Sequence, residues 1–154
     1  MFGFYHYLCG MIINPTTSVK RIGIKRTEKI AEMVIDWCKV NLGVNRRRKS
    51  PITHLCIKGR VENDGSRTFG WYDPEDNIIG LSYNLHNTLG DLIQTIIHEY
   101  VHSMQPVITK YKRLYKTHGY KNHPFEIEAR VLADQLHYKC LQENKEILKN
   151  ILTK

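Results

Sequence analysis

An apolar stretch at residues 88–105, TLGDLIQTIIHEYVHSMQ, constrains the fold of this chain more than any other part of the sequence. Its apolar residues recur at helical spacing and cover a broad face, so they predict a helix with much of its surface buried. They are Leu89, Leu92, Ile93, Ile96, Ile97, Val101 and Met104. Thr88 with Asp91 three residues later predicts a capping pair at the helix start, and Pro106 predicts its end. We therefore expect the rest of the domain to pack around this helix.

The same helix carries His98, Glu99 and His102 in the order H-E-x-x-H. Residues four apart on a helix lie roughly 5–6 Å apart at Cβ, so both imidazoles can turn toward one ion while Glu99 projects from an adjoining surface. A zinc ion on two histidines lowers the pKa of bound water to about 7, and a neighbouring carboxylate that is not a ligand can take the proton. The motif thus predicts Zn²⁺ on His98 and His102, with Glu99 as the general base of a metallopeptidase. The alternative is a core helix that happens to contain two histidines.

The length of 154 residues fits one domain with a real core, and we expect a single domain at residues 27–154 after an N-terminal segment at 1–26. The chain has 23 Lys and Arg against 15 Asp and Glu, a formal net charge of +8. This charge permits contact with nucleic acid without requiring it. The basic run at 45–49, NRRRK, fits either a solvated loop or a patch that contacts phosphates. For a peptidase, the expected partner is a protein or peptide substrate.

The opening segment, MFGFYHYLCGMII, is apolar but lacks the basic start and small-residue cleavage pattern of a signal peptide, and it is too short to cross a membrane. We therefore expect no membrane partner. An edge strand, a partly disordered tail and translated sequence upstream of a start at Met11 all remain open for this segment. The four cysteines are far apart and form no C-x-x-C pair, which predicts free thiols in a reducing, cytoplasmic compartment.

The remaining periodic segments predict an α+β fold. Helical patterns begin at Thr27, the expected N-cap, and again after Pro106 and at Pro124. Three β-rich runs predict strands, and turn-forming residues predict a hairpin between the last two; the runs are 52–58, 67–72 and 77–83. We expect a three-stranded, mainly antiparallel sheet packed with an N-terminal helix, the H-E-x-x-H helix and a long C-terminal helix. An exposed edge of this sheet could hold an extended peptide by backbone hydrogen bonds, although an ordinary hairpin without ligand contact fits equally well.

A catalytic zinc usually takes three protein ligands and leaves one position open. The candidates downstream of the motif are His118, His123, Glu126, Glu128 and His137. Glu126 and Glu128 lie two apart on the predicted helix, so their side chains diverge and only one of them can face the metal. His123 precedes a proline at a helix start, where it can instead act as a cap or an orienting group. The residues alone leave the third ligand open.

The H-E-x-x-H motif followed by residues 122–129, NHPFEIEA, resembles the small gluzincin metallopeptidases, most closely the compact phage-type and ImmA/IrrE-like zinc peptidase domains. The resemblance covers mainly residues 77–135. It implies a minimal zincin-like fold in which a second helix carries E-x-x-A or E-x-E-A and its first Glu, here Glu126, binds zinc. Many gluzincins have an Asp directly after that Ala, whereas this chain has Arg130, so that position supplies no carboxylate to hold a zinc-bound histidine. If a phage encodes the protein, the resemblance implies action in the host cytoplasm.

A second resemblance is to SprT-like proteases, which combine a sheet hairpin, an H-E-x-x-H helix and a third histidine in an H-G-x-x-F type context. The residues Thr117-His118-Gly119-Tyr120 lie about the right distance downstream, and Phe125 is displaced from the position of that pattern. This resemblance implies His118 as the third ligand and an association with DNA, which the basic charge would suit. The longer E-x-E-A match favours Glu126.

For a peptidase, the two motif histidines and Glu126 would bind zinc, Glu99 would transfer the proton, and a tyrosine would steady the oxyanion. We prefer Tyr120 because it directly precedes the ligand helix, with Tyr111 and Tyr115 left open. Two rival functions belong to other classes. One is a zinc-stabilised DNA- or protein-binding module without turnover, and the other is a metal-free helical core protein.

Overall fold

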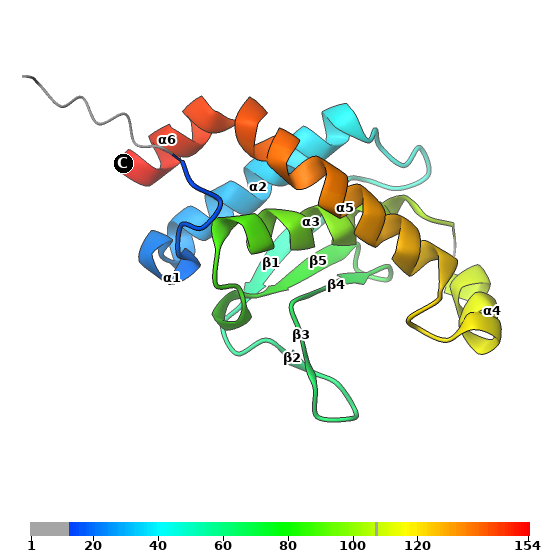
Figure 1. The fold of residues 1–154 in the computed structure, drawn as a ribbon. Helices are drawn as coiled ribbons and strands as arrows, with labels where there is room; N and C mark the ends of the chain where they lie inside the picture. The colour runs from blue at the N-terminus through cyan, green and yellow to red at the C-terminus, as the bar shows by residue number, and fades with distance from the viewer. Residues whose placement is uncertain (1–12, 107) are drawn as a thin grey trace, which may run out of the picture.

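The computed structural model describes residues 13–106 and 108–154, and this part of the chain forms an α+β domain with six α-helices and a small three-stranded mixed sheet (Figure 1). Most of the helices gather above the sheet in this view, the helix at residues 108–118 lies apart from them at the lower right, and a short hairpin projects below the sheet. The apolar segment at residues 1–12, with Met11, lies outside the described residues, and so do all three expectations for it. None of the helices in the described ranges has the length and apolar character that a membrane span requires.

The helices are α1 (Val19–Ile22), α2 (Ile24–Asn41), α3 (Leu89–Met104), α4 (Ile108–His118), α5 (Pro124–Glu143) and α6 (Lys145–Thr153), with a 3₁₀ turn η1 (Tyr83–Leu85). The strands are β1 (Ile52–Cys56), β2 (Arg60–Val61), β3 (Arg67–Thr68), β4 (Gly70–Asp73) and β5 (Ile78–Ser82). The predicted α+β class and the three-stranded sheet are confirmed. The second predicted strand is divided at Phe69 into β3 and β4.

The main sheet has the order β1-β5-β4. The predicted hairpin is confirmed as β4 and β5, which pair antiparallel from Gly70↔Leu81 to Asp73↔Ile78. The expectation of a mainly antiparallel sheet is wrong for the other pairing, because β1 runs parallel to β5 from Ile52↔Ile78. Alternation of apolar and polar residues predicts the buried face of a strand but not its direction. After β1 the chain passes through β2, β3 and β4 and returns in β5 beside β1, and this long connection makes a parallel pair.

Two glycines let β4 pack closely on both of its faces. On one face, the Trp71 ring lies directly over Gly80 of β5, in the place that a Cβ atom would need. On the other face, a Cβ at Gly70 would lie 2.6 Å from Thr95 Cγ2 of α3. Because neither position has room for a side chain, β4 packs tightly on β5 through Trp71 and on the H-E-x-x-H helix through Gly70.

The core lies between the sheet and the helices. Helix α2 packs on β1 and α3, while α3 packs on β4 and β5 and supports α5 on its other side. Helix α2 begins at Ile24 rather than after Thr27, so the predicted cap is wrong. The Thr27 hydroxyl donates instead to Gly23 O, four residues earlier (2.8 Å), inside a helix that has already started.

The C-terminal periodic pattern forms two helices rather than one. Asn144 ends α5 and precedes α6, and its side-chain Nδ2 donates to Cys140 O (2.9 Å). This bond satisfies a carbonyl at the end of α5. Helix α5 itself is 20 residues long, so the sequence correctly predicts a long helix here but misses its end.

Candidate metal centre

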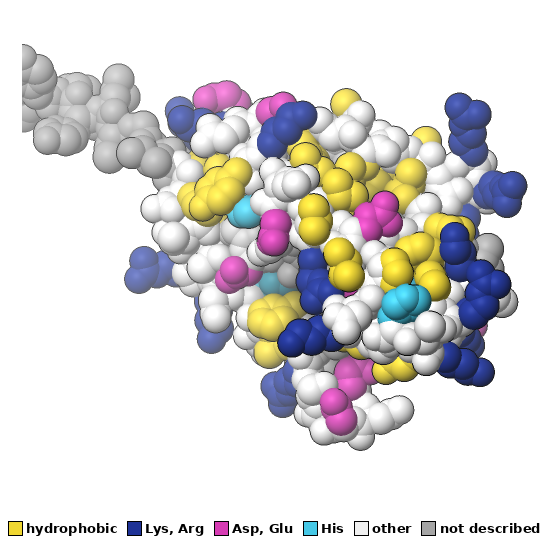
Figure 2. Space-filling view, turned by 45° about the vertical axis from the view of Figure 1, so that its right-hand side comes forward, with side chains coloured by type: hydrophobic (Ala, Val, Ile, Leu, Met, Phe, Trp, Pro, Cys, Tyr) yellow, Lys and Arg dark blue, Asp and Glu magenta, His cyan; other side chains and the backbone are white. Residues whose placement is uncertain are grey.

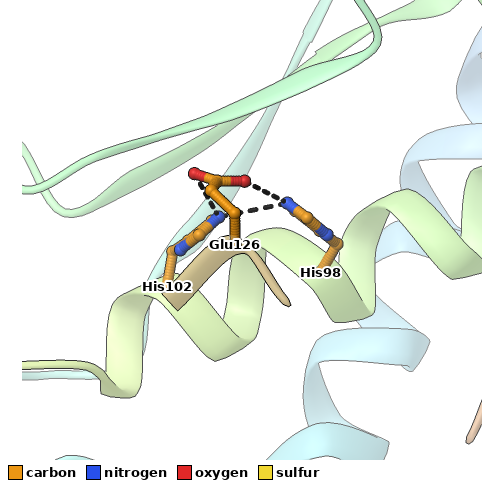
Figure 3. Close-up of side chains that lie close together, drawn as sticks. All are labelled: His98, His102 and Glu126. Carbon is orange, nitrogen blue, oxygen red and sulfur yellow. Dashed lines mark hydrogen bonds and ion pairs between the residues drawn. The ribbon is translucent and has the colours of Figure 1, made fainter. Parts of the chain in front are cut away.

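Helix α3 sets the direction of the two motif histidines. It begins with the predicted capping box, in which Thr88 Oγ1 accepts from Asp91 N (3.1 Å) and the Asp91 carboxylate accepts from Thr88 N (3.2 Å). From Leu89 to Val101, the apolar residues of the predicted stripe are buried. Burial of that face fixes the rotation of the helix and directs His98 and His102 toward the first turn of α5 (Figure 3).

His98, His102 and Glu126 converge on one point (Figure 3). His98 Nε2 lies 3.1 Å from His102 Nε2 and 3.4 Å from Glu126 Oε2, and His102 Nε2 lies 3.5 Å from Glu126 Oε1. The three side chains are largely buried, with exposed fractions of 18%, 14% and 6% in the same order. One ligand atom from each lies within 4.8 Å of the other two. The three residues therefore form a group that could hold a metal ion.

These separations resemble the edges of a tetrahedral site. Zinc binds imidazole nitrogen and carboxylate oxygen at about 2.0–2.2 Å, which places two ligand atoms of a tetrahedron about 3.3–3.6 Å apart. The two nitrogen-to-oxygen separations, 3.4 and 3.5 Å, fall in that range, and the nitrogen-to-nitrogen separation of 3.1 Å is slightly shorter. Two imidazoles and one carboxylate are also a donor set that hydrolytic zinc sites use. The residues present thus fit a divalent metal ion of this kind.

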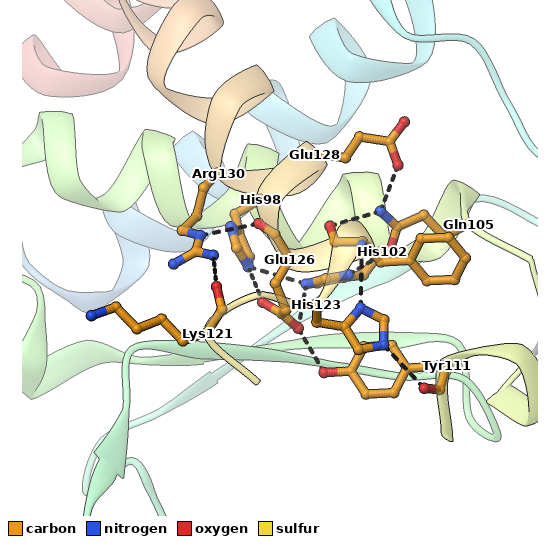
Figure 4. A network of polar contacts seen from close by, with 10 residues as sticks. His98, His102, Gln105, Tyr111, Lys121, His123, Glu126, Glu128 and Arg130 are labelled. Carbon is orange, nitrogen blue, oxygen red and sulfur yellow. Dashed lines mark hydrogen bonds and ion pairs between the residues drawn. The ribbon is translucent and has the colours of Figure 1, made fainter. Parts of the chain in front are cut away.

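Gln105, directly after α3, fixes the orientation of His102 (Figure 4). Its Oε1 lies 2.7 Å from His102 Nδ1, and its Nε2 donates to Phe125 O (3.0 Å) and Glu128 Oε2 (2.9 Å). Because Nε2 faces two acceptors, Oε1 is the amide oxygen, and it must accept its bond from His102 Nδ1–H. The lone pair of a neutral His102 is then on Nε2, the atom that points into the cluster. An orienting partner of this kind is typical of metal-bound histidines.

Glu99 lies beside the cluster and is only 7% exposed. Burial raises the pKa of Glu99 above its ordinary value, against the opposing influence of His102 and His98. Strand β4 lies close to this side chain, since a Cβ at Gly70 would be 3.2 Å from Glu99 Cγ. A carboxylate with a raised pKa next to a metal position is suited to accept and return a proton.

Glu126 is the most buried member of the cluster. Burial by itself would raise its pKa, but hydrogen bonds with His102 and His98 outweigh that effect and hold the pKa well below its ordinary value. The Tyr111 hydroxyl donates a further hydrogen bond to Glu126 Oε1 (2.8 Å). Glu126 is therefore held as a charged carboxylate, the form that binds a metal.

Two of the other candidate ligands point elsewhere. The Glu128 carboxylate accepts from Gln105 instead of facing the histidines, as expected from its spacing relative to Glu126. His118 is exposed at the end of α4, with Nδ1 3.1 Å from Leu114 O, and it is not part of the cluster. The geometry thus brings together the third ligand that the gluzincin resemblance implies and not the one that the SprT resemblance implies.

His123 has a structural role that matches the predicted cap. Its Nδ1 accepts from Phe125 N (3.1 Å), so its Nε2 carries the proton and donates to Tyr111 O (3.0 Å). The ring is fully buried and stacks on Tyr111 with centroids 4.0 Å apart. With both nitrogens engaged, His123 joins α4 to the start of α5 and is not a metal ligand. His137, farther along α5, has its Nδ1 3.1 Å from Ala133 O.

The tyrosine predicted for the oxyanion, Tyr120, lines the cleft in front of the cluster, and the residue is 59% exposed. Desolvation of its hydroxyl, followed by the charge of Glu126, raises the pKa of Tyr120 to about 12. It therefore stays protonated at neutral pH and can donate a hydrogen bond. Tyr111 and Tyr115 line the same cleft, and Tyr111 is the one with a defined bond to the cluster.

Arg130 occupies the position where many gluzincins have an Asp. Its Nε donates to Glu126 O (3.2 Å) and its guanidinium donates to Lys121 O (2.7 Å), so it supports the backbone around the ligand rather than a histidine (Figure 4).

The sequence did not predict Gln105 as the group that orients His102. Its position at the end of the helix, three residues after His102, is the sequence feature that could have indicated this contact.

The cluster opens into a cleft of about 900 Å³. One wall is the β2–β3 hairpin and β4, another is α4, and a third is the loop that carries Arg48. Aromatic rings line much of it: Trp71, Tyr72, Tyr111, Tyr115, Tyr120 and Phe125. The cleft is large enough for an extended peptide segment.

Comparisons with protein-family models, curated proteins and solved structures give no match for this chain. The two family resemblances therefore remain predictions, and the function is inferred from the geometry of the site.

Proposed function

We propose that the protein is a zinc-dependent metallopeptidase that hydrolyses peptide bonds. The observation that carries the proposal is the convergence of His98, His102 and Glu126 beside a buried glutamate that is not one of the three. Two imidazoles and a carboxylate leave one zinc position for water or substrate. A buried Glu99 at the same site supplies the proton acceptor that hydrolysis needs.

His98, His102 and Glu126 would hold the zinc ion. When bound, zinc supplies a Lewis acid for the scissile carbonyl and lowers the pKa of a bound water. Glu99 would accept a proton from the attacking water and deliver it to the leaving amine. The Tyr120 hydroxyl, kept protonated by its raised pKa, donates to the oxygen on which negative charge develops.

The substrate would lie along β4. This strand is at the edge of the sheet, so one row of its backbone N–H and C=O groups is not paired within the sheet, and the strand lines the cleft through Gly70, Trp71 and Tyr72. An extended peptide can add to such an edge by backbone hydrogen bonds. This placement holds the scissile bond near Glu99, against which Gly70 packs.

The test combines metal content with cleavage. Protein purified without added metal is analysed for bound metal, and wild type and Glu99→Gln are incubated with a proteome-derived peptide library that is read by mass spectrometry. We expect about one zinc per chain in both proteins, cleavage by wild type, and a rate lower by about 10²–10⁴-fold in Glu99→Gln. Loss of metal in Glu99→Gln would contradict the role given to Glu99. Zinc in both proteins without any wild-type cleavage would instead favour a zinc-stabilised binding module.

A further inference from the structure

Arg48 is a partly buried guanidinium on the wall of the cleft. Its Nη1 donates to the Tyr72 hydroxyl (3.0 Å). The ion pairs of the described residues join other groups, and none includes Arg48. A guanidinium has a fork of N–H donors suited to a carboxylate, and most of the Arg48 donors have no partner within the described chain.

The position of Arg48 is fixed by a chain of hydrogen bonds. The Tyr72 hydroxyl, which accepts from Arg48, donates to Asn77 Oδ1 (2.9 Å), and Asn77 Nδ2 donates to Lys49 O (2.8 Å). The loop is also joined to the site helix, because Asn45 Nδ2 donates to Ser103 O (3.3 Å). The guanidinium is therefore held in place before any ligand arrives, which lowers the entropy cost of binding.

Tyr72 connects Arg48 to the strand along which the substrate is proposed to lie. Tyr72, the hydrogen-bond partner of Arg48, is on the edge strand β4 and lines the same cleft as Glu99. A peptide lying along β4 would thus pass from the neighbourhood of Glu99 toward Arg48. Asp73, the acidic residue that follows Tyr72, already accepts from Glu75 N (2.9 Å) within its own turn.

The charges of the cleft are divided between its walls. Arg48 and Lys112 line it from the loop and from α4, and α4 contains no acidic residue. Glu62 and Asp64 line it from the hairpin. Figure 2 shows acidic side chains at the bottom of that view, where the hairpin projects, while the rest of that face carries Lys and Arg side chains together with further acidic ones. A substrate with a negative group next to Arg48 would be complementary in charge to this wall of the cleft.

We propose that Arg48 is a specificity-determining residue that binds a carboxylate of the peptide substrate. The inference rests on the proposed peptidase function. A carboxylate can come from an acidic side chain near the scissile bond or from the C-terminus of a short peptide, and both would form charge-assisted hydrogen bonds with the guanidinium. The two sources are distinguished by experiment.

The experiment begins with the peptide that wild type cleaves best in the library. It is synthesised in three further forms, with acidic residues near the cleaved bond replaced by their amides, with an amidated C-terminus, and with both changes. Removal of the bound carboxylate is expected to lower kcat/KM by about tenfold or more, as for other hydrogen bonds to charged groups. Loss on side-chain replacement identifies an acidic side chain, and loss on C-terminal amidation identifies a terminal carboxylate.

The same peptides are then given to Arg48→Gln, Arg48→Lys and Arg48→Glu. The Gln variant should cleave the acidic and amide forms at equal rates, the Lys variant should keep a reduced preference, and the Glu variant should prefer basic residues at that position. Arg46→Gln is the matched control, because Arg46 is an exposed residue of the same loop that does not line the cleft. Thermal melts confirm that each variant is folded.

Binding separates this inference from the proposed function. The Glu99→Gln protein, and its double variant with Arg48→Gln, are titrated with fluorescent peptides that carry acidic residues and with their amide counterparts, chosen independently of cleavage. Tighter binding of the acidic form, lost in the double variant, supports the role of Arg48 whether or not wild type cleaves. Wild-type cleavage with equal rates for acidic and amide peptides, or an acid preference that survives in Arg48→Gln, would overturn the inference and leave the peptidase proposal standing.

Discussion

The Gln105 side-chain oxygen accepts the Nδ1 proton of His102 while its nitrogen is bound to the first turn of α5. One amide therefore orients a candidate ligand on α3 and fastens the helix that supplies Glu126. Here a neutral amide at the end of the motif helix serves one of the two histidines.

Replacement of Gln105 should weaken metal binding. Gln105→Met keeps the length of the side chain but removes the acceptor for His102 and the donor to Phe125 O, and we expect zinc affinity to fall by about 10–100-fold. Glu128→Gln is the control, because its amide oxygen can still accept from Gln105 and it is not a member of the cluster. Competition with a chromophoric chelator measures the zinc affinity of both variants. Equal affinities in the two variants would show that Gln105 does not support the site.

The choice of the third ligand is tested through stability. Zinc at about 100 times its dissociation constant should stabilise wild type by about 2.7 kcal/mol, which corresponds to a rise in Tm of about 5–10 °C for a domain of this size. Glu126→Gln should lose most of this rise, because the variant lacks the anionic ligand. His118→Asn should keep all of it. The reverse result would favour the SprT-like ligand set.

Gly70→Ala should disturb the general base more than the metal. The new Cβ would lie 2.6 Å from Thr95 Cγ2 and 3.2 Å from Glu99 Cγ, so either β4 or α3 must shift. We expect a loss of about 1–3 kcal/mol in the free energy of unfolding, reduced peptide cleavage and unchanged zinc content. Adding Thr95→Ser removes Cγ2, the atom nearest to the new Cβ, and should restore part of the activity. Failure of that second change to help would contradict this packing.

The two tyrosines near Glu126 should differ in their kinetic effect. Tyr111 already donates to Glu126, so Tyr111→Phe should mainly weaken zinc binding. Tyr120→Phe should lower kcat by about 10²-fold or more with little change in KM, as for loss of an oxyanion donor. Steady-state kinetics at saturating zinc separates the two effects. A Tyr120→Phe protein with wild-type kcat would remove Tyr120 from the mechanism.

His86 should make the fold sensitive to mild acid. It is fully buried, its Nδ1 lies 2.9 Å from Ser82 O, and its Nε2 has no partner in the described residues. Burial lowers the pKa of His86 below the ordinary value of 6.5. As pH falls below about 6.5, the unfolded chain takes a proton that the folded chain resists, so the free energy of unfolding decreases until the lowered pKa is reached.

The measurement is urea unfolding of metal-free protein between about pH 7.5 and 5, where only the ordinary His pKa falls within the range. Wild type and His86→Asn are compared, because the Asn amide can still donate to Ser82 O. The variant will be less stable at every pH. The difference between the two proteins should shrink as the pH falls, and a constant difference would contradict the assignment to His86.

Much of the site could be predicted because it depends on local spacing. The capping box, the apolar face of α3 and the four-residue separation of His98 and His102 are properties of one helix. The cap at His123 followed from a second helix start, and Glu126 followed from the resemblance of that start to the E-x-E-A motif. The parallel pairing of β1 with β5 and the role of Gln105 depend on contacts between distant segments, and no local pattern records them. The proposed role of Arg48 could not be read from NRRRK either, because it depends on hydrogen bonds that join Arg48 to Tyr72 and Tyr72 to Asn77, which are distant in the sequence.

Strand β4 is locked on both faces, by Trp71 over Gly80 and by Gly70 against α3. Sliding it by one residue along β5 would bring a side chain to a place where only glycine fits. The outer edge of the strand is therefore held at a fixed position relative to Glu99. Under the proposed function, a peptide that pairs with it would be cut at a set number of residues from its first paired backbone group.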